Sequence, residues 1–159
     1  LAHTDSSTQI ALEASGGDGR LTLTGVTAID DVGALDLAAA DLSGHATLGG
    51  KVGSLIIGDL HNAQIDVSGA GDLTIRAGRV SDSQLHAPLA NLTLVASNWL
   101  SSTAGASQFE LAALRSLTTS GDFNADLKVS GQGVTTYALG SVQIGGTISG
   151  GVCSGLASM

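Results

Sequence analysis

The chain has 159 residues, of which 43% are hydrophobic but only 3% aromatic, and it carries 23 glycines, one proline and a net charge of −8. The acidic balance argues against a nucleic-acid-binding surface or an anionic-membrane surface, both of which need Lys and Arg. No run of about 18 apolar residues is present, so no membrane insertion is expected. The apolar content is aliphatic, which suits a narrow core of stacked Leu, Val and Ile side chains.

The two ends of the chain carry weaker signals than its middle. Leu1 is not an initiator Met and no secretion-signal pattern follows it, so the sequence is expected to be part of a longer or processed chain. Residues 1–18 contain one strand-like run, 8–14, and are predicted to form a cap or partial coil. Residues 153–159 are predicted to be a fraying tail. Its Cys153 is the single cysteine, so no intrachain disulfide can form.

Residues 53–94 contain one short pattern twice and begin it a third time. An alternating apolar pair recurs every 18 to 19 residues, at Leu55 and Ile57, Leu73 and Ile75, and Leu92 and Leu94. A small, a polar and an apolar residue follow the pair, as in Gly58-Asp59-Leu60. Self-similarity at this period is typical of a solenoid, and alternation places the pair inward.

The same pattern, stretched or shortened, accounts for residues 19–152. Further pairs occur at Leu21 and Leu23, Leu35 and Leu37, and Val142 and Ile144. The sequence therefore predicts an all-β parallel solenoid of about seven coils. One coil is longer, because residues 101–115 intervene before Leu117, and we expect an insertion bulging from the wall there. Its middle, SQFELAALR, fits a two-turn helix or an irregular strand, and apolar spacing does not choose between them.

One polar residue precedes the second apolar position of each coil. This column holds Asp41, Asp59, Arg79, Asn98, Asp122 and Thr147, and each follows a small residue, namely Ala40, Gly58, Gly78, Ser97, Gly121 and Gly146. Such a column predicts a corner between two sheets. Gly allows the positive φ that a tight bend often needs, and Asp or Asn caps a bend through its side chain.

Several of these segments resemble a known class of protein. GSLIIGDLHNAQIDVSG, SLTTSGDFNADLKVSGQG and LGSVQIGGTISGG resemble the Gly-rich coils of very large bacterial β-solenoid surface proteins. LTLTGV and GALDLAAADL resemble filamentous-haemagglutinin-type exoproteins and autotransporter passengers. The resemblance covers roughly residues 19–152 and implies a right-handed solenoid. It also implies a non-enzymatic, structural or adhesin-like segment of a secreted or surface-displayed protein, located outside the cell or on its surface.

The resemblance also implies partners. These are flanking domains or coils of a longer parent chain and a carbohydrate or host-surface ligand, with no cofactor. Self-association through the coil ends is a further interpretation, since exposed strand edges favour it. A second class stays open on that ground, the bactofilin-type cytoskeletal filament, whose short β-helices polymerise end to end.

A carbohydrate-active β-helix enzyme is the third class. Such an enzyme would need clustered carboxylates in a groove. Here Asp36 is expected on a strand face, while Asp41, Asp59 and Asp122 are expected at corners. No catalytic, cofactor or metal residues are therefore predicted. The histidines form no ligand motif and fall at different coil offsets, at His3, His45, His61 and His86.

The remaining motifs have simpler interpretations. GGDGRLTL, residues 16–23, resembles half of a calcium-binding nonapeptide, but we expect a turn. Outward threonines at Thr22, Thr74 and Thr93 would suit an ice-binding face, but Asp36, Ile56 and Gln143 are expected in the same column, and β-propensity explains the threonines. Asn91-Leu92-Thr93 is a glycosylation sequon, in a predicted strand that argues against modification. Trp99 is either a binding platform or, as we favour, the filler of a widened core.

Overall fold

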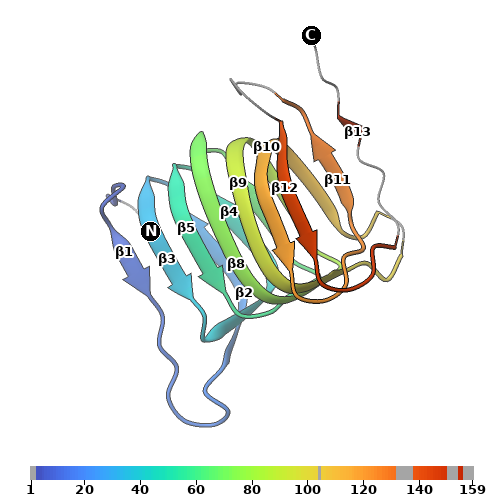
Figure 1. The fold of residues 1–159 in the computed structure, drawn as a ribbon. Coiled ribbons are helices and arrows are strands. Elements are labelled where there is room, and N and C mark those ends of the chain that lie inside the picture. The colour runs from blue at the N-terminus through green and yellow to red at the C-terminus, as the bar shows by residue number, and fades with distance from the viewer. Residues whose placement is uncertain (1–2, 104, 132–137, 150–153, 156–159) are drawn as a thin grey trace.

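The computed structural model describes residues 3–103, 105–131, 138–149 and 154–155. In this part of the chain every strand pairing is parallel and no helix is present (Figure 1). The strands are β1 (Gln9–Ala11), β2 (Leu21–Ala28), β3 (Val32–Leu37), β4 (Ala40–Leu48), β5 (Val52–Ile57), β6 (Leu60–His61), β7 (Gln64–Val67), β8 (Gly71–Ser81), β9 (Gln84–Leu100), β10 (Gln108–Thr119), β11 (Asp126–Val129), β12 (Leu139–Ile144) and β13 (Ser154–Gly155).

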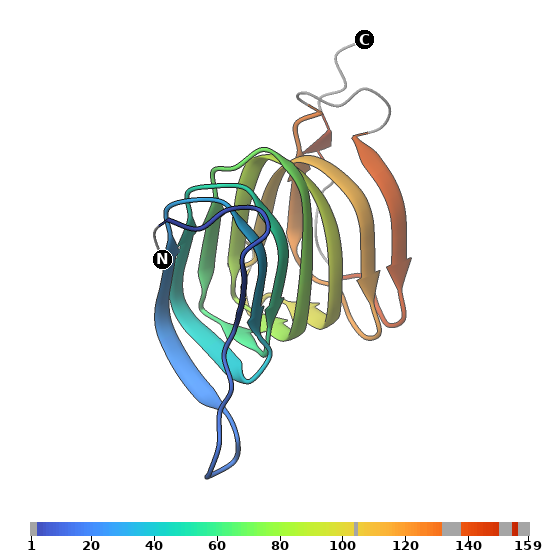
Figure 2. The same ribbon diagram turned by 90° about the vertical axis from the view of Figure 1, so that its left-hand side faces the viewer.

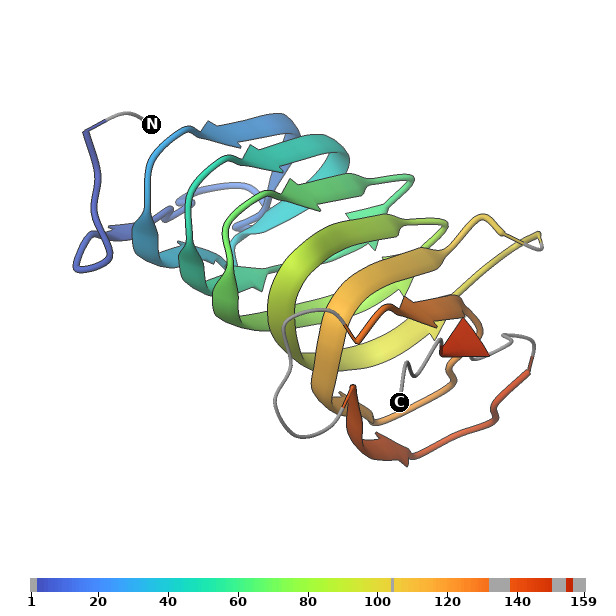
Figure 3. The ribbon, with the colours of Figure 1, turned by 90° about the horizontal axis from the view of Figure 1, so that it is seen from above.

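Each turn of the chain has three sides, and the turns stack along one axis (Figure 3). Side 1 is formed by β1, β3, β5, the start of β8, the middle of β9, the end of β10 and β12. Side 2 is formed by the starts of β2 and β4, by β6, and by the ends of β8 and β9. Side 3 is formed by the ends of β2 and β4, by β7, by the starts of β9 and β10, and by β11 and β13. The fold is a parallel β-solenoid.

The solenoid has about five turns, fewer than the seven predicted. Five turns run from β3 to β11 and pair with a turn on both faces, whereas in the described residues the turns of β1 with β2 and of β12 with β13 pair on one face only. One of the two missing coils is the terminal turn that begins at β12, and the other arises at LTLTGV. Leu21 pairs with Ala40 and Leu23 pairs with Leu42, so this segment lies on side 2 of the first turn. It does not begin a coil of its own.

The core is a narrow stack of aliphatic side chains, as the composition predicted. On side 1 the stack is continuous and in register, and it consists of Leu35, Leu55, Ile75, Leu94 and Leu117. These side chains are buried because alternation turns them inward at every turn. Burying apolar surface stabilises a fold by about 25 cal/mol per Å², so each added turn contributes to stability through contact with its neighbours.

The register between β5 and β8 also differs from the one that the aligned repeats predict. Leu73 pairs with Leu92 at the expected offset, but Leu55 pairs with Ile75 and not with Leu73. A slip of two residues keeps every side chain on its own face, because the side-chain period of a strand is two. The hydrophobic pattern alone is therefore compatible with Leu55 opposite either Leu73 or Ile75, and contacts with neighbouring turns select Ile75.

The expected insertion is narrower than residues 101–115. Residues 101–103 and 105–107 lie between β9 and β10, in what we call the 101–107 loop, whereas 108–115 lie in β10, which pairs with β9 on sides 3 and 1. SQFELAALR is thus a strand. Its register shifts between Leu111 and Ala113 and again between Leu114 and Ser116, where the chain rounds the corner between these sides.

Candidate functional site

The predicted corner column is present between sides 1 and 2, and we call it the corner ladder. The Asp59 N–H donates to Asp41 Oδ1 at 2.7 Å, and the Arg79 N–H donates to Asp59 Oδ1 at 2.7 Å. In later turns Asn98 Oδ1 accepts from the Asp122 N–H at 2.8 Å, and Asp122 Oδ1 accepts from the Thr147 N–H at 2.7 Å. The sequence-based expectation that Asp and Asn cap these bends is confirmed.

The glycines of the corner ladder serve a different purpose from the one predicted. Gly58, Gly78, Gly121 and Gly146 do not have positive φ. Instead, a Cβ at Gly78 would lie 2.4 Å from Asp59 Oδ1, and the other three would meet the capping oxygen of the preceding turn at 1.9 to 2.6 Å. Glycine is therefore required at this position where the preceding turn supplies a capping Asp or Asn. Ser97, which follows the non-capping Arg79, keeps its Cβ.

The N-terminal end of the corner ladder is closed by an arginine. Arg20 donates from Nε and Nη2 to the two carboxylate oxygens of Asp41. The hydrogen bond from Arg20 lowers the pKa of the Asp41 carboxyl. The corner carboxylates thus accept backbone or guanidinium hydrogen bonds and act as structural caps.

A second ladder, which the sequence analysis missed, lies at the corner between sides 2 and 3. Ser83 and Ser107 are buried there. The Ala63 N–H donates to Ser83 Oγ at 3.1 Å, and the Ser83 N–H donates to Ser107 Oγ at 3.3 Å. Ser107 Oγ donates to the Leu100 carbonyl at 2.7 Å. Unequal turn lengths hide this column in the sequence, since Ser83 and Ser107 are 24 residues apart.

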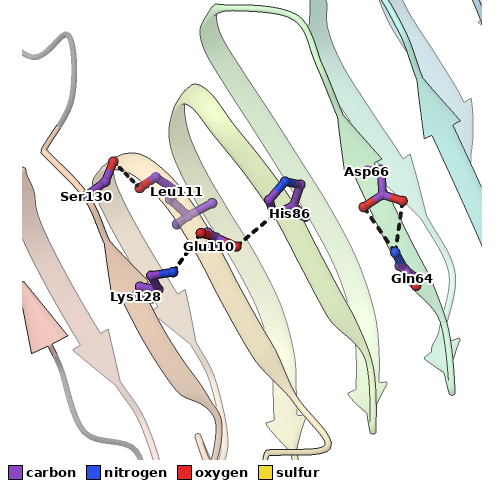
Figure 4. A network of polar contacts seen from close by, with 7 residues as sticks. All are labelled: Gln64, Asp66, His86, Glu110, Leu111, Lys128 and Ser130. Atoms are coloured by element: carbon purple, nitrogen blue, oxygen red, sulfur yellow. Dashed lines mark hydrogen bonds and ion pairs between the residues drawn. The ribbon is translucent and has the colours of Figure 1, made fainter.

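The richest set of titratable groups faces outward on side 3, and we call it the polar strip. It consists of Gln64, Asp66, His86, Glu110 and Lys128 (Figure 4). Lys128 Nζ donates to Glu110 Oε1 at 2.8 Å, and His86 Nδ1 lies 3.0 Å from Glu110 Oε2. Gln64 Nε2 donates to Asp66 Oδ2 at 2.9 Å.

The electrostatics of the polar strip are those of a solvated ion-pair network. The hydrogen bond from Lys128 is the main cause of the lowered pKa of Glu110. Glu110 and Lys128 are exposed, so solvent screening keeps the energy of this pair small. His86, Glu110 and Lys128 contact one another across three successive turns, whereas Asp66 contacts Gln64 on its own strand, and the geometry of the first three supports cohesion between turns.

The histidines occupy separate columns, in keeping with their different offsets. His45 Nε2 lies 2.5 Å from Asp66 Oδ2, and His61 Nδ1 lies 2.7 Å from Ser81 Oγ. Within the described residues no group of three or more His, Cys, Asp and Glu side chains is placed to hold a metal ion.

Trp99 belongs to the core. It is 1% exposed, and its ring lies 4.1 Å from that of Phe109, which in turn lies 6.0 Å from that of Phe123. The core-filling interpretation is confirmed and the binding-platform alternative is wrong. The aromatic cluster fills the turns next to the 101–107 loop, where side 2 passes into side 3.

The expected threonine column is wrong in two respects. Thr74 and Thr93 are in register on side 1, with Ser54 and Ser116 as their neighbours, whereas Thr22 lies on side 2 opposite Asp41. Asp36, Ile56 and Gln143 were expected in the threonine column, but they lie in the adjacent column, two residues further along each strand, together with Arg76. The misplaced Thr22 follows from the same assignment of LTLTGV to the wrong side.

Two further motifs take their expected positions. Residues 16–19 form a turn with positive φ at Gly16, Gly17 and Gly19, and Asp18 Oδ1 accepts from the Arg20 N–H at 3.0 Å. Asn91 lies within β9, and its Nδ2 donates to Asp72 Oδ1 at 3.2 Å. Cys153 lies outside the described residues.

Comparisons with known proteins give no relative. No family model, no curated protein and no solved structure is matched by this chain. The described part of the structure contains no helix of the length and apolarity needed to cross a membrane.

Proposed function

We propose that this chain is a non-enzymatic, rod-forming segment of a secreted or surface-displayed bacterial protein. The observation that supports the proposal most is the continuity of the stack. Inward columns on all three sides run in register from turn to turn, and ladders of side-chain to backbone hydrogen bonds follow two of its corners. Such a stack resists bending because each turn is bonded to the next along its whole outline.

The polar side chains favour a mechanical role over a chemical one. The corner carboxylates cap backbone N–H groups, and Glu110 of the polar strip bonds to the turns on both sides of it. A general acid or base needs a free carboxyl or imidazole within reach of a substrate. The corner carboxylates and Glu110 connect turns instead, which is what a shaft requires.

The extracellular setting comes from the resemblance of the Gly-rich coils to bacterial surface solenoids. On this proposal the flanking coils or domains of the parent protein carry the binding of a carbohydrate or host-surface ligand. The segment described here sets their distance from the cell, at about 4.8 Å per turn.

Surface labelling of intact cells tests the location. An epitope inserted between Gly17 and Asp18 of the parent protein would sit in a turn that extends beside the stack (Figure 2), where a Cβ at Gly16 or Gly17 meets no neighbouring atom. We expect antibody to label intact cells, with an epitope-tagged cytoplasmic protein as the negative control. Labelling that requires permeabilised cells would contradict a surface-displayed segment.

A further inference from the structure

Side 3 carries two adjacent columns of outward side chains over four successive turns, and we call these eight side chains the side 3 face. The first column consists of Gln64, Gln84, Gln108 and Asp126. The second column, two residues further along each strand, consists of Asp66, His86, Glu110 and Lys128. All eight side chains are exposed or half-buried and none is apolar, so this face suits a partner with matching charges and hydrogen-bonding groups.

The second column alternates between acids and bases along the axis of the solenoid (Figure 4). Asp66 and Glu110 are its acids, and His86 and Lys128 are its bases. In the reverse direction the order is base, acid, base, acid. A copy rotated by 180° about an axis parallel to the strands, midway between His86 and Glu110, would therefore bring an acid opposite every base. Lys128 of that copy lies opposite Asp66, and its Glu110 lies opposite His86.

The first column matches itself under the same rotation. Gln84 lies opposite Gln108, and each amide can both donate and accept a hydrogen bond. Gln64 lies opposite Asp126, so its amide N–H group meets a carboxylate. Sheets that pack face to face are about 10 Å apart, a gap that two glutamine side chains, or a lysine and an aspartate, can span.

We propose that the side 3 face binds the side 3 face of a second copy of this chain, with the two rods running in opposite directions. The contact is isologous, because each residue pair occurs twice about the two-fold axis, and such a contact closes at the dimer. Further turns of a longer rod would continue side 3 along its axis without covering this face. The inference is therefore compatible with flanking coils, and it does not depend on the location of the protein.

Other outward columns of the same four turns do not match themselves in this way. In the corner ladder, Asp59 would lie opposite Asp122, and two carboxylates would repel each other. On side 1, Arg76 would lie opposite Val95, which leaves its charge without a partner. The charge order thus selects side 3 over these two columns as the surface for a second copy.

The size of the face sets the expected strength of the contact. Four turns of four residues extend about 19 Å along the axis and about 13 Å along the strands, which is well below the roughly 800 Å² per partner of a stable complex. One segment should therefore dimerise weakly, at a chain concentration of about 1 mM. Added salt should weaken the dimer, because exposed charges are screened.

Sedimentation equilibrium of the 159-residue chain at low ionic strength tests the proposal. The wild type should form dimers and no larger species. Lys128→Glu and Asp66→Lys each place like charges opposite one another twice in the dimer, and each should raise the dimer dissociation constant at least about tenfold. Arg76→Glu is the matched control, because it reverses an exposed cation on side 1, and it should leave dimerisation unchanged.

An equimolar mixture of Lys128→Glu and Asp66→Lys tests the direction of the rods. In a mixed dimer, position 66 of each variant faces an opposite charge at position 128 of the other, so the mixture should dimerise although each variant alone does not. Thermal melting of each variant checks that the fold is intact. A mixture that stays monomeric would overturn the antiparallel arrangement. A wild type that stays monomeric at about 1 mM, or that forms species larger than dimers, would overturn the closed contact through side 3.

Discussion

At the scale of single residues, the corner ladder couples two positions on successive turns. Asp59 caps the Arg79 N–H, and Gly78 leaves the space that the Asp59 carboxylate fills. The sequence predicted the capping residues from their repeated position. It did not predict why glycine precedes them, because close approach depends on the neighbouring turn and positive φ is the more familiar use of glycine.

Substitutions at this corner should therefore be non-additive. Asp59→Ala leaves the Arg79 N–H without its acceptor and should lower the free energy of unfolding by about 1 kcal/mol, whereas Arg79→Ala, which removes no cap, should change it by less than about 0.5 kcal/mol. Gly78→Ala should be destabilising in the wild type and less so in the Asp59→Ala background. Urea unfolding of the wild type, the three single variants and the Asp59→Ala/Gly78→Ala double variant gives the coupling free energy between positions 59 and 78. Equal costs of Gly78→Ala in both backgrounds would contradict the steric explanation.

Glu110 in the polar strip should make the stability of the fold depend on pH, and the sign of that dependence follows from its pKa. Its pKa is lowered from the usual 4.5, chiefly by the hydrogen bond from Lys128. A lowered folded-state pKa adds stability that is complete above the ordinary pKa and is lost as the pH falls through the folded-state value. At neutral pH the wild type should thus have a higher melting temperature than Glu110→Gln. This difference in melting temperature, the gap, should close as the pH falls below about 4.5. In a Lys128→Gln background the gap at neutral pH should shrink. A gap that widens in acid would contradict this assignment.

At the scale of elements, β10 shows the limit of apolar spacing. Leu111, Ala112, Ala113 and Leu114 are all buried because the strand rounds a corner there. An unbroken buried run lacks the alternation that identifies a strand, so the sequence allowed a helix at this point. The 101–107 loop before it closes on the buried serine ladder, whose spacing the sequence does not reveal.

Ser107 should be the most sensitive position of that loop. Ser107→Ala removes the donor to the Leu100 carbonyl and the acceptor of the Ser83 N–H in a buried site, which should cost about 1–3 kcal/mol. Ser102→Ala, at an exposed position of the same loop, should cost less than about 0.5 kcal/mol. Thermal or urea unfolding compares the two. Similar losses for both would show that the buried ladder contributes little.

At the scale of the whole molecule, a turn should be removable as a unit. Gly71 pairs with Ala90, so deletion of residues 71–89 joins equivalent positions and brings Leu55 over Leu94. We expect a folded β-solenoid with a lower melting temperature, since stability is roughly a sum over turns. The deletion also places Ser97 above Asp59, so an added Ser97→Gly should raise the melting temperature again. Deletion of residues 71–80, about half a turn, should abolish cooperative unfolding, and a folded product would contradict the stacking.

The solenoid itself, its aliphatic core and its corner column could be predicted from the repeat, because these depend on local alternation and on one repeated position. The register between turns could not, because a two-residue slip leaves all faces unchanged. A different ambiguity placed LTLTGV on side 1 and Thr22 beside Thr74, because Leu-Thr-Leu alternation fits a strand on any side of the turn.

The stacking of the turns is tested most directly by the register between β5 and β8, which engineered disulfides can measure. In a Cys153→Ser background, Ser54→Cys with Thr74→Cys joins in-register neighbours, about 4.8 Å apart, within the Cα range of a disulfide. Ser54→Cys with Asp72→Cys tests the slipped register and should place the Cα atoms about 8 Å apart. We expect rapid oxidation of the first pair and none of the second. Preferential oxidation of the second pair would contradict the arrangement of turns described here.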